Sequence, residues 1–213
     1  MSPRVECLTL AGDPDTWRSL GFVVTDDGRL PLYGTSLRIV APSSDADAAT
    51  SGITGWTLSG VPDASTPSAI DGLPTTVAAA STPTFADHPV TAIGLDHVVV
   101  LTPDLERTSS AIAEATGCEL KRVREVGTMR QGFHRVGSGG LIVELVERPD
   151  ADVPDGPATF WGVVVNVDDL DAACERIGLD RISAPKDAVQ PGRRIATVRN
   201  DVGLGLPVAL MTP

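Results

Sequence analysis

Two stretches in the C-terminal half of the chain share one pattern of apolar and polar positions. They are His97–Leu105 and Gly162–Leu170, and each places a β-branched run shortly before an acidic residue and a leucine. Their starts are 65 residues apart. The apolar runs that close the two copies, Leu141–Val146 and Leu206–Met211, are separated by the same 65 residues. Equal spacing at both ends predicts a structural unit that occurs twice.

Each copy is predicted to contain one strand, one helix and three further strands. The runs Val98–Val100 and Val163–Val165 are typical of buried strands. Helix starts are expected at Thr102-Pro103 and Asp168-Asp169, and helix ends at Gly117 and Gly178. The strands expected after the helices are Glu119–Val126, Gln131–Val136 and Leu141–Val146, then Arg181–Ala184, Arg194–Val198 and Val208–Met211.

A single unit of this kind leaves one face of its sheet uncovered, so two units are expected to pair. We therefore predict an α+β fold in which two βαβββ modules, residues 93–150 and 158–213, form a half-open barrel with a cleft inside. Residues 93–213 would then be one paired-module domain.

The N-terminal part shows a shorter and weaker version of the same pattern. Residues 1–60 are interpreted as a degenerate βαβββ-like module, with a helix starting near Asp13 and a possible opening strand of a further unit at Gly55–Val61. The strands expected before that are Val5–Leu10, Gly21–Thr25, Arg29–Tyr33 and Leu37–Val40. Residues 61–92, rich in Pro, Ser, Thr and Ala, are a linker or a truncated module. A small α+β extension of the main domain is the alternative.

Composition narrows the classes of partner. The 213 residues carry 17 Lys and Arg against 28 Asp and Glu, a net charge of −11. This balance argues against nucleic acid and anionic membranes as partners, since both need clustered cations. Three isolated cysteines indicate neither a disulfide framework nor a zinc-thiolate site. No signal peptide or membrane span is recognisable, so a cytoplasmic location is expected.

Three short motifs occur in a characteristic order. Leu95–Val100, Pro103–Leu105 and Leu141–Leu145 resemble the module signature of the vicinal oxygen chelate superfamily, which contains glyoxalases, bleomycin-resistance proteins and extradiol dioxygenases. The resemblance implies the paired βαβββ fold. In metal-dependent members each module offers a donor on its first strand and a carboxylate on its fourth. Four donors then hold a divalent ion that chelates vicinal oxygens of the substrate.

Mapped onto this chain, the resemblance gives half of that donor set. His97 matches the first-strand ligand and Glu144 the fourth-strand ligand, whereas the second module has Gly162 and Ala209 there. The N-terminal positions fall near Cys7 or Leu8, at Val40 and at Thr57, and offer no second set. A divalent metal cofactor is therefore doubtful, because two protein donors seldom hold zinc or nickel firmly.

Glu144 interrupts an otherwise apolar strand, where a charge is costly unless it is paired or functional. Strand alternation places Glu144 toward the cleft if its neighbours face the helices. Glu144 and His97 are thus the candidate catalytic pair, although a hydrogen-bonded rim histidine is an equal alternative for His97. The further candidates for ligand binding are Gln131, Phe133, His134, Trp161, Arg193 and Arg194.

Two functions remain open, together with a weaker third. The first is an enzyme of the lyase or isomerase kind that acts on a small oxygenated molecule. The second is a metal-free protein that sequesters a small molecule, as in the bleomycin-resistance branch. The third is a decayed cleft on a scaffold. A small-molecule ligand is the expected partner. Pairing of module edges would give a homodimer, and the alternative is that the N-terminal unit covers those edges within one chain.

Overall fold

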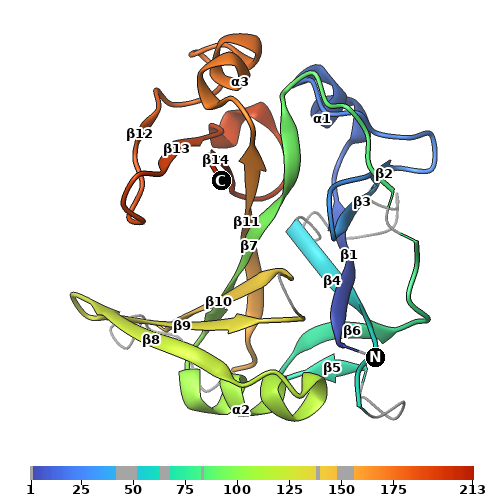
Figure 1. The fold of residues 1–213 in the computed structure, drawn as a ribbon, viewed down its shortest axis with the longest axis vertical. Coiled ribbons are helices and arrows are strands. Elements are labelled where there is room, and N and C mark those ends of the chain that lie inside the picture. Colours follow the sequence, from blue (N-terminus) through green and yellow to red (C-terminus); the bar gives the residue numbers. More distant parts are fainter. Residues whose placement is uncertain (1, 42–51, 63–67, 83, 138–139, 148–155) are drawn as a thin grey trace.

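A computed structural model describes residues 2–41, 52–62, 68–82, 84–137, 140–147 and 156–213. The C-terminal half forms an eight-stranded mixed sheet in the order β12-β13-β14-β11-β7-β10-β9-β8 (Figure 1). Its strands are β7 (Ala92–Thr102), β8 (Leu120–Val126), β9 (Met129–Arg135), β10 (Ile142–Glu147), β11 (Thr159–Val167), β12 (Lys186–Asp187), β13 (Arg194–Thr197) and β14 (Val208–Met211). Helices α2 (Leu105–Thr116) and α3 (Leu170–Ile177) and a short 3₁₀ turn η1 (Asn200–Val202) complete this half.

The register of the sheet reproduces the sequence repeat. Parallel pairing sets Val98 of β7 beside Val143 of β10, and Val163 of β11 beside Val208 of β14, with the same spacing along the chain. Strands β7 and β11 are antiparallel, and Val98 pairs with Val163, its equivalent in the other copy. The two modules are therefore related by an approximate two-fold axis at this pair, and the predicted paired-module fold is confirmed.

The helices begin at acidic caps. Asp169 caps α3 by accepting a hydrogen bond from the backbone amide of Ala172 at 2.9 Å, as predicted. In α2 the cap is Asp104, not Thr102, because the Asp104 carboxylate reaches the amide of Arg107 at 2.9 Å. Thr102 instead accepts from the Asp104 amide at 3.0 Å and so shapes the turn before the helix.

One strand of the second module lies elsewhere than predicted. Residues 181–184 form only an isolated bridge, between Ile182 and Val198, and the short strand β12 follows at Lys186–Asp187. Pro185 lies between the two and has no amide hydrogen to donate to a ladder. Ile182 is fully buried, so the apolar signal came from core packing rather than from a strand.

The N-terminal half repeats the arrangement with shorter elements. Its sheet has the order β2-β3-β1-β4-β6-β5, with β1 parallel to β3, β4 parallel to β6, and β1 antiparallel to β4. The elements are β1 (Arg4–Ala11), α1 (Pro14–Ser19), β2 (Arg29–Leu30), β3 (Ser36–Val40), β4 (Gly52–Ser59), β5 (Ala69–Ile70) and β6 (Leu73–Val77). Strands β5 and β6 thus lie within residues 61–92, the segment interpreted as a linker or a truncated module.

The strand predicted at residues 21–25 is absent. The guanidinium of Arg18 donates hydrogen bonds to the carbonyl oxygens of Val24 at 3.0 Å and Thr25 at 2.9 Å. A side chain therefore satisfies the acceptors that a neighbouring strand would otherwise use. Phe22 and Val24 of this segment are nevertheless buried, which accounts for its apolar sequence pattern.

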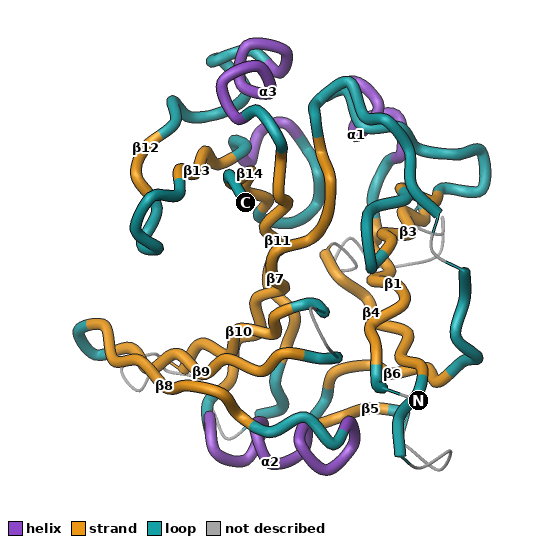
Figure 2. The backbone as a smooth tube through the Cα atoms, viewed as in Figure 1, coloured by secondary structure: helices purple, strands orange, loops and turns teal. Residues whose placement is uncertain are grey.

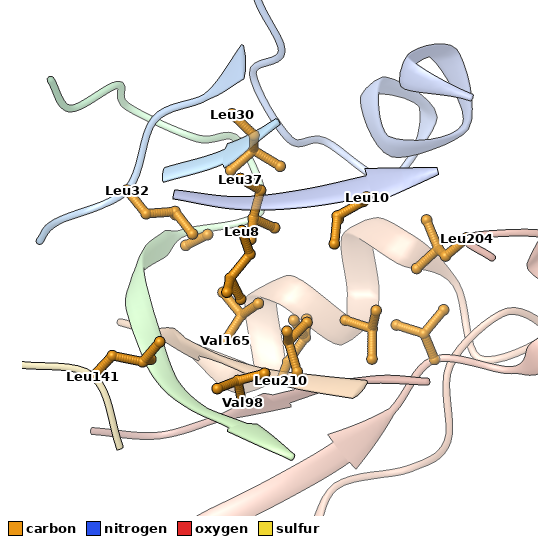
Figure 3. Close-up of a cluster of buried hydrophobic side chains, with 14 of the residues drawn as sticks. Leu8, Leu10, Leu30, Leu32, Leu37, Val98, Leu141, Val165, Leu204 and Leu210 are labelled. Carbon is orange, nitrogen blue, oxygen red and sulfur yellow. The ribbon is translucent and has the colours of Figure 1, made fainter. Parts of the chain in front are cut away.

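The two sheets share one hydrophobic core (Figure 3). Leu8 and Leu10 of β1 face Val98 of β7 and Val165 of β11, and all four side chains are buried. At another point of this contact Trp56 packs edge-on against Phe160, with the ring centroids 5.4 Å apart. The core occupies one face of the C-terminal sheet, so the other face is left to form the cleft.

Candidate functional site

A cavity of about 330 Å³ lies on the face of the C-terminal sheet opposite the shared core. Strands β7, β9, β10, β11, β13 and β14 all contribute to its wall, so both modules build it. Figure 2 shows the course of these strands in the backbone, with α2 and α3 at opposite ends of the view. Its polar lining residues are His97, Gln131, Glu144 and Thr197, and the rest of the wall is apolar. The volume is at the lower end of the range typical of small-molecule sites.

Strand alternation directs Glu144 into this cavity. Val143 and Leu145, its neighbours on β10, are fully buried in the shared core, so the Glu144 side chain points to the opposite face. The carboxylate accepts a hydrogen bond from the Gln131 amide at 2.8 Å, and its other oxygen lies 3.3 Å from His97 Nε2. Burial raises the pKa of the Glu144 carboxyl above its ordinary value, although the charges of His97 and Arg124 act in the opposite direction.

His97 is held by its sequence neighbour. Its Nδ1 lies 2.7 Å from a carboxylate oxygen of Asp96. Since an ionised carboxylate can only accept, Nδ1 carries the hydrogen, and Nε2 is turned toward Glu144. Asp96, His97 and Glu144 therefore form a continuous chain in which His97 and Glu144 are close enough to share a proton.

Hydrogen bonds from Arg193 and Asn166 fix Asp96. Arg193 donates to Asp96 at 2.8 Å and to the side-chain oxygen of Asn166 at 2.7 Å, and Asn166 donates to Asp96 at 3.3 Å. Burial alone would raise the pKa of Asp96, but the hydrogen bonds from His97 and Arg193 lower that pKa to about 2. Arg193 thus reaches the site through Asp96 and does not itself line the cavity.

Sequence reasoning missed Asp96 and Asn166. Asn166 carried the signal that singled out Glu144, because it is a polar residue within the apolar run of β11. Asp96 directly precedes His97, and a carboxylate beside a functional imidazole is a common orienting device. Their pairing with Arg193 joins segments far apart in the sequence, which no local pattern reveals.

Two predicted ligand-binding residues lie away from the cavity. His134 faces the helix side of β9, where its Nδ1 hydrogen-bonds the Cys118 carbonyl at 2.9 Å and its Nε2 meets Ser109 Oγ at 3.0 Å. Arg194 pairs with Asp171 of α3 at 2.7 Å on the surface. The structure therefore does not bring either residue to the cavity wall, because the sequence allowed the alternation of β9 and β13 to be assigned to either face.

The aromatic candidates Trp161 and Phe133 differ in whether they reach the cavity. Trp161 lines the cavity and is 46% exposed, so it lies at the mouth. Phe160 points to the opposite face and packs on Trp56. Phe133 shares a face with Gln131 but lies outside the cavity wall, with the Arg122 guanidinium 4.9 Å above its ring.

The residues present do not fit the four-donor metal site that the resemblance implies. In the described part of the cavity wall, the donors typical of such sites are the His97 imidazole and the Glu144 carboxylate, which already contact each other. Ala209 lines the wall without a donor, and a Cβ at Gly162 would lie 2.6 Å from the Pro207 carbonyl oxygen. A ligand side chain at that position would therefore require the backbone to move.

The acidic group of Asp104, Glu106 and Glu147 has a structural explanation. Glu147 is buried on the helix side, where it accepts a hydrogen bond from the amide of Leu105 at 2.8 Å. Its other oxygen pairs with Arg130 at 2.9 Å, and Arg130 also pairs with Glu106. These contacts anchor the start of α2 to the sheet.

We expect the free energy of unfolding to fall as the pH decreases from about 7.5 to 5.5. Burial lowers the pKa of His88 and of His134, and each ring is hydrogen-bonded through both nitrogens in its neutral form. The unfolded chain has its ordinary histidine pKa of about 6.5, so it binds more protons below that pH. Urea unfolding at both pH values checks this.

A matched variant tests the assignment to histidine. His134→Gln is expected to be less stable than the original chain at pH 7.5 but to show a weaker dependence on pH. The carboxylates with lowered pKa, Asp96 among them, lose their contribution only at more acidic pH. An unchanged pH dependence in His134→Gln would contradict the prediction for this residue.

Comparison with known proteins agrees with this geometry. A family model described as the Glyoxalase/Bleomycin resistance protein/Dioxygenase superfamily matches residues 94–195. The chain therefore carries a domain of this superfamily, and the resemblance found in the sequence motifs is confirmed. Comparison with curated protein sequences gave no match.

Solved structures extend the likeness to the whole chain. A triply substituted 4-hydroxymandelate synthase from Streptomyces coelicolor superimposes with a TM-score of 0.62 at 16% identity, covering 100% of this chain and 93% of the other. Methylmalonyl-CoA epimerase from Mycobacterium tuberculosis matches with a TM-score of 0.47 at 20% identity, over 58% of this chain and 89% of that one. The first likeness shows that the N-terminal half shares the fold. Within the described residues, no helix is long and apolar enough to cross a membrane.

Proposed function

We propose that the cavity binds a small carbonyl-bearing molecule and that Glu144 moves a proton at the carbon next to the carbonyl, a reaction of the isomerase or lyase kind. The observation that carries this proposal is a buried carboxylate in a largely apolar cavity, contacted by His97 Nε2 at 3.3 Å and by the Gln131 amide at 2.8 Å. A small oxygenated ligand is expected from the size of the cavity.

The surroundings of Glu144 suit a general base. A carboxylate in an apolar site is a stronger base than one in water, because burial favours its neutral form. In the proposed step the Cα–H bond breaks, the proton joins a Glu144 oxygen, and the electron pair moves onto the carbonyl oxygen as an enolate. Gln131, and His97 when protonated, are the hydrogen-bond donors near enough to stabilise that oxygen. Return of the proton gives the rearranged product.

His97 is proposed to tune and relay this proton. Its Nδ1 is committed to Asp96 at 2.7 Å, so only Nε2 is available on the cavity side. Because Asp96 remains ionised, it stabilises the imidazolium that forms whenever His97 takes the proton from Glu144. No metal ion is required for this step, and the donor set gives no reason to add one.

The second candidate is sequestration without chemistry. It is favoured by the apolar character of the wall, to which Val99, Leu101, Val146, Val164 and Ile195 all contribute. Such a wall holds an apolar body well whether or not a reaction follows. If the protein only binds the ligand, replacement of Glu144 should have little effect on that binding. If the protein transfers a proton, Glu144 should be essential for the reaction.

Hydrogen–deuterium exchange separates the two candidates. Phenylacetone serves as a probe, because it is small and has acidic hydrogens beside its carbonyl. In D₂O the protein is expected to accelerate loss of the benzylic proton NMR signal, and Glu144→Gln is expected to lower that acceleration by about 10²-fold or more. The acceleration should persist in EDTA, since the cavity lacks a complete metal-ligand set.

Glu114→Gln is the matched control, because Glu114 is an exposed carboxylate on the outer part of α2. It is expected to leave exchange unchanged. Exchange that survives in Glu144→Gln would remove Glu144 from the proposed role. Binding of phenylacetone by the original chain without any accelerated exchange would favour sequestration.

A further inference from the structure

The two modules contribute unlike walls to the cavity. The first module supplies His97, Gln131 and Glu144: the Gln131 amide donates a hydrogen bond to Glu144, and His97 Nε2 lies 3.3 Å from the same carboxylate. The strands β11 and β14 of the second module supply Trp161, Val163, Val164, Val208 and Ala209, all of them apolar. A ligand in this cavity therefore meets hydrogen-bonding groups on one side and an apolar surface on the other.

The described wall of the cavity contains no lysine or arginine. Arg193 is committed to Asp96, Asn166 and the Thr212 carbonyl, and Arg194 to Asp171. Arg124 lies across from Gln131 on β8, and its charge favours ionisation of Glu144, but it lies outside the wall. Arg193 and Arg194 therefore already pair with acids of the protein, and the described wall offers a ligand no lysine or arginine.

An anionic ligand would meet two unfavourable effects here. It would lose its hydration in a largely apolar site without gaining a cation from the wall. It would also lie close to the Glu144 carboxylate, and like charges at short range repel strongly where water is excluded. The net charge of −11 adds a weaker repulsion over a longer distance.

We infer that the cavity selects an uncharged molecule, with an apolar body and one hydrogen-bonding oxygen, over the corresponding carboxylate. This inference deepens the proposed function and rests on it for the placement of the oxygen beside Glu144, His97 and Gln131. The volume of about 330 Å³ limits the ligand to roughly the size of a substituted aromatic ring with a short chain. The partly exposed ring of Trp161 at the mouth lies beside the apolar body.

Phenylacetone and phenylacetate form a suitable pair of probes, because they have nearly the same shape and differ in charge. Binding is followed by the fluorescence of Trp161, since Trp17 and Trp56 are fully buried in the core. Phenylacetone is expected to bind at least tenfold more tightly than phenylacetate at pH 7.5. The signal should disappear in Trp161→Phe, while ligand-detected NMR on the same variant still reports binding.

A gain of charge provides the complementary test. Thr197 lines the cavity, is exposed, and has no side-chain hydrogen bond among those found in the described residues, so substitution there is expected to preserve the fold. Thr197→Lys is expected to reverse the preference toward phenylacetate, whereas Thr197→Met, of similar length without charge, should retain the preference for phenylacetone. Equal or tighter binding of phenylacetate to the original chain would overturn the inference.

The outcomes also separate this inference from the proposed function. Preferential binding of phenylacetone without Glu144-dependent exchange would support the selectivity and reject the proton transfer. Glu144-dependent exchange together with tight phenylacetate binding would support the proton transfer and reject the selectivity. Absence of binding by either probe at millimolar concentration would reject the inferred ligand class.

Discussion

Replacement of Trp56 by alanine is expected to lower the free energy of unfolding by about 3–5 kcal/mol, because it empties a large volume in a fully packed core. Trp56 is 2% exposed, its ring packs against Phe160 of the other sheet, and its indole N–H donates to Thr75 Oγ at 2.7 Å. The variant therefore loses apolar burial, a contact between the two sheets and a buried hydrogen bond. Guanidinium unfolding followed by circular dichroism measures the loss.

The same experiment tests whether the two sheets unfold together. Because their apolar faces form one core, a single transition is expected in the original chain. Trp161→Ala is the control. Because Trp161 is partly exposed at the cavity mouth, its replacement should lower the free energy of unfolding much less. A loss below about 1 kcal/mol in Trp56→Ala, or two separate transitions in the original chain, would contradict a shared core.

The sequence was sufficient for the fold of the C-terminal half because its signals are local and repeated. The runs Val98–Val100 and Val163–Val165 have the composition of buried strands, and the repeat ties each to the same succession of elements. The structure pairs Val98 with Val163 across the two-fold axis. The failures at residues 21–25 and 181–184 have a common cause, which is that burial and strand pairing give the same apolar signal.

The faces of β9 show what the sequence left undetermined. Gly132 and His134 share one face, and Gln131 shares the other with Phe133, so neither face is uniformly apolar. The position of helix α2 determines which face of β9 is turned away from the cavity. A Cβ at Gly132 would lie 3.2 Å from the Leu120 side chain and 3.3 Å from that of Leu105, so the glycine marks the side on which α2 approaches. A glycine within a strand often indicates such an approach, and this signal could have placed His134.

Part of the candidate site could likewise be predicted from the sequence, and part could not. Glu144 could be placed from its own strand, because a charge within an apolar run has a definite face once the apolar residues are assigned. The contacts that hold His97 could not be predicted from one strand. They depend on Asp96 of β7, Asn166 of β11 and Arg193 of the turn before β13, which come together only in the folded chain. Arg193 was a candidate for ligand binding, and in the structure it pairs with Asp96, a carboxylate of the protein itself.

Substitution of Arg193 by methionine is expected to lower the free energy of unfolding by about 3–5 kcal/mol, because it leaves the buried Asp96 carboxylate without its cation. The side chains of Arg193 and Asp96 are 19% and 9% exposed, so solvent compensates little for the loss. The pKa of Asp96, now about 2, should rise as a consequence. Urea unfolding at pH 7.5 measures the change in stability.

A double substitution shows whether the loss comes from the unpaired charge. Asp96→Asn together with Arg193→Met removes both charges and is expected to be more stable than Arg193→Met alone, since no buried ion is then left without a partner. Arg135→Met, at an exposed arginine of β9, serves as the control for loss of a surface cation. If Arg193→Met costs no more than Arg135→Met, then Arg193 does not stabilise the Asp96 carboxylate that contacts His97 Nδ1.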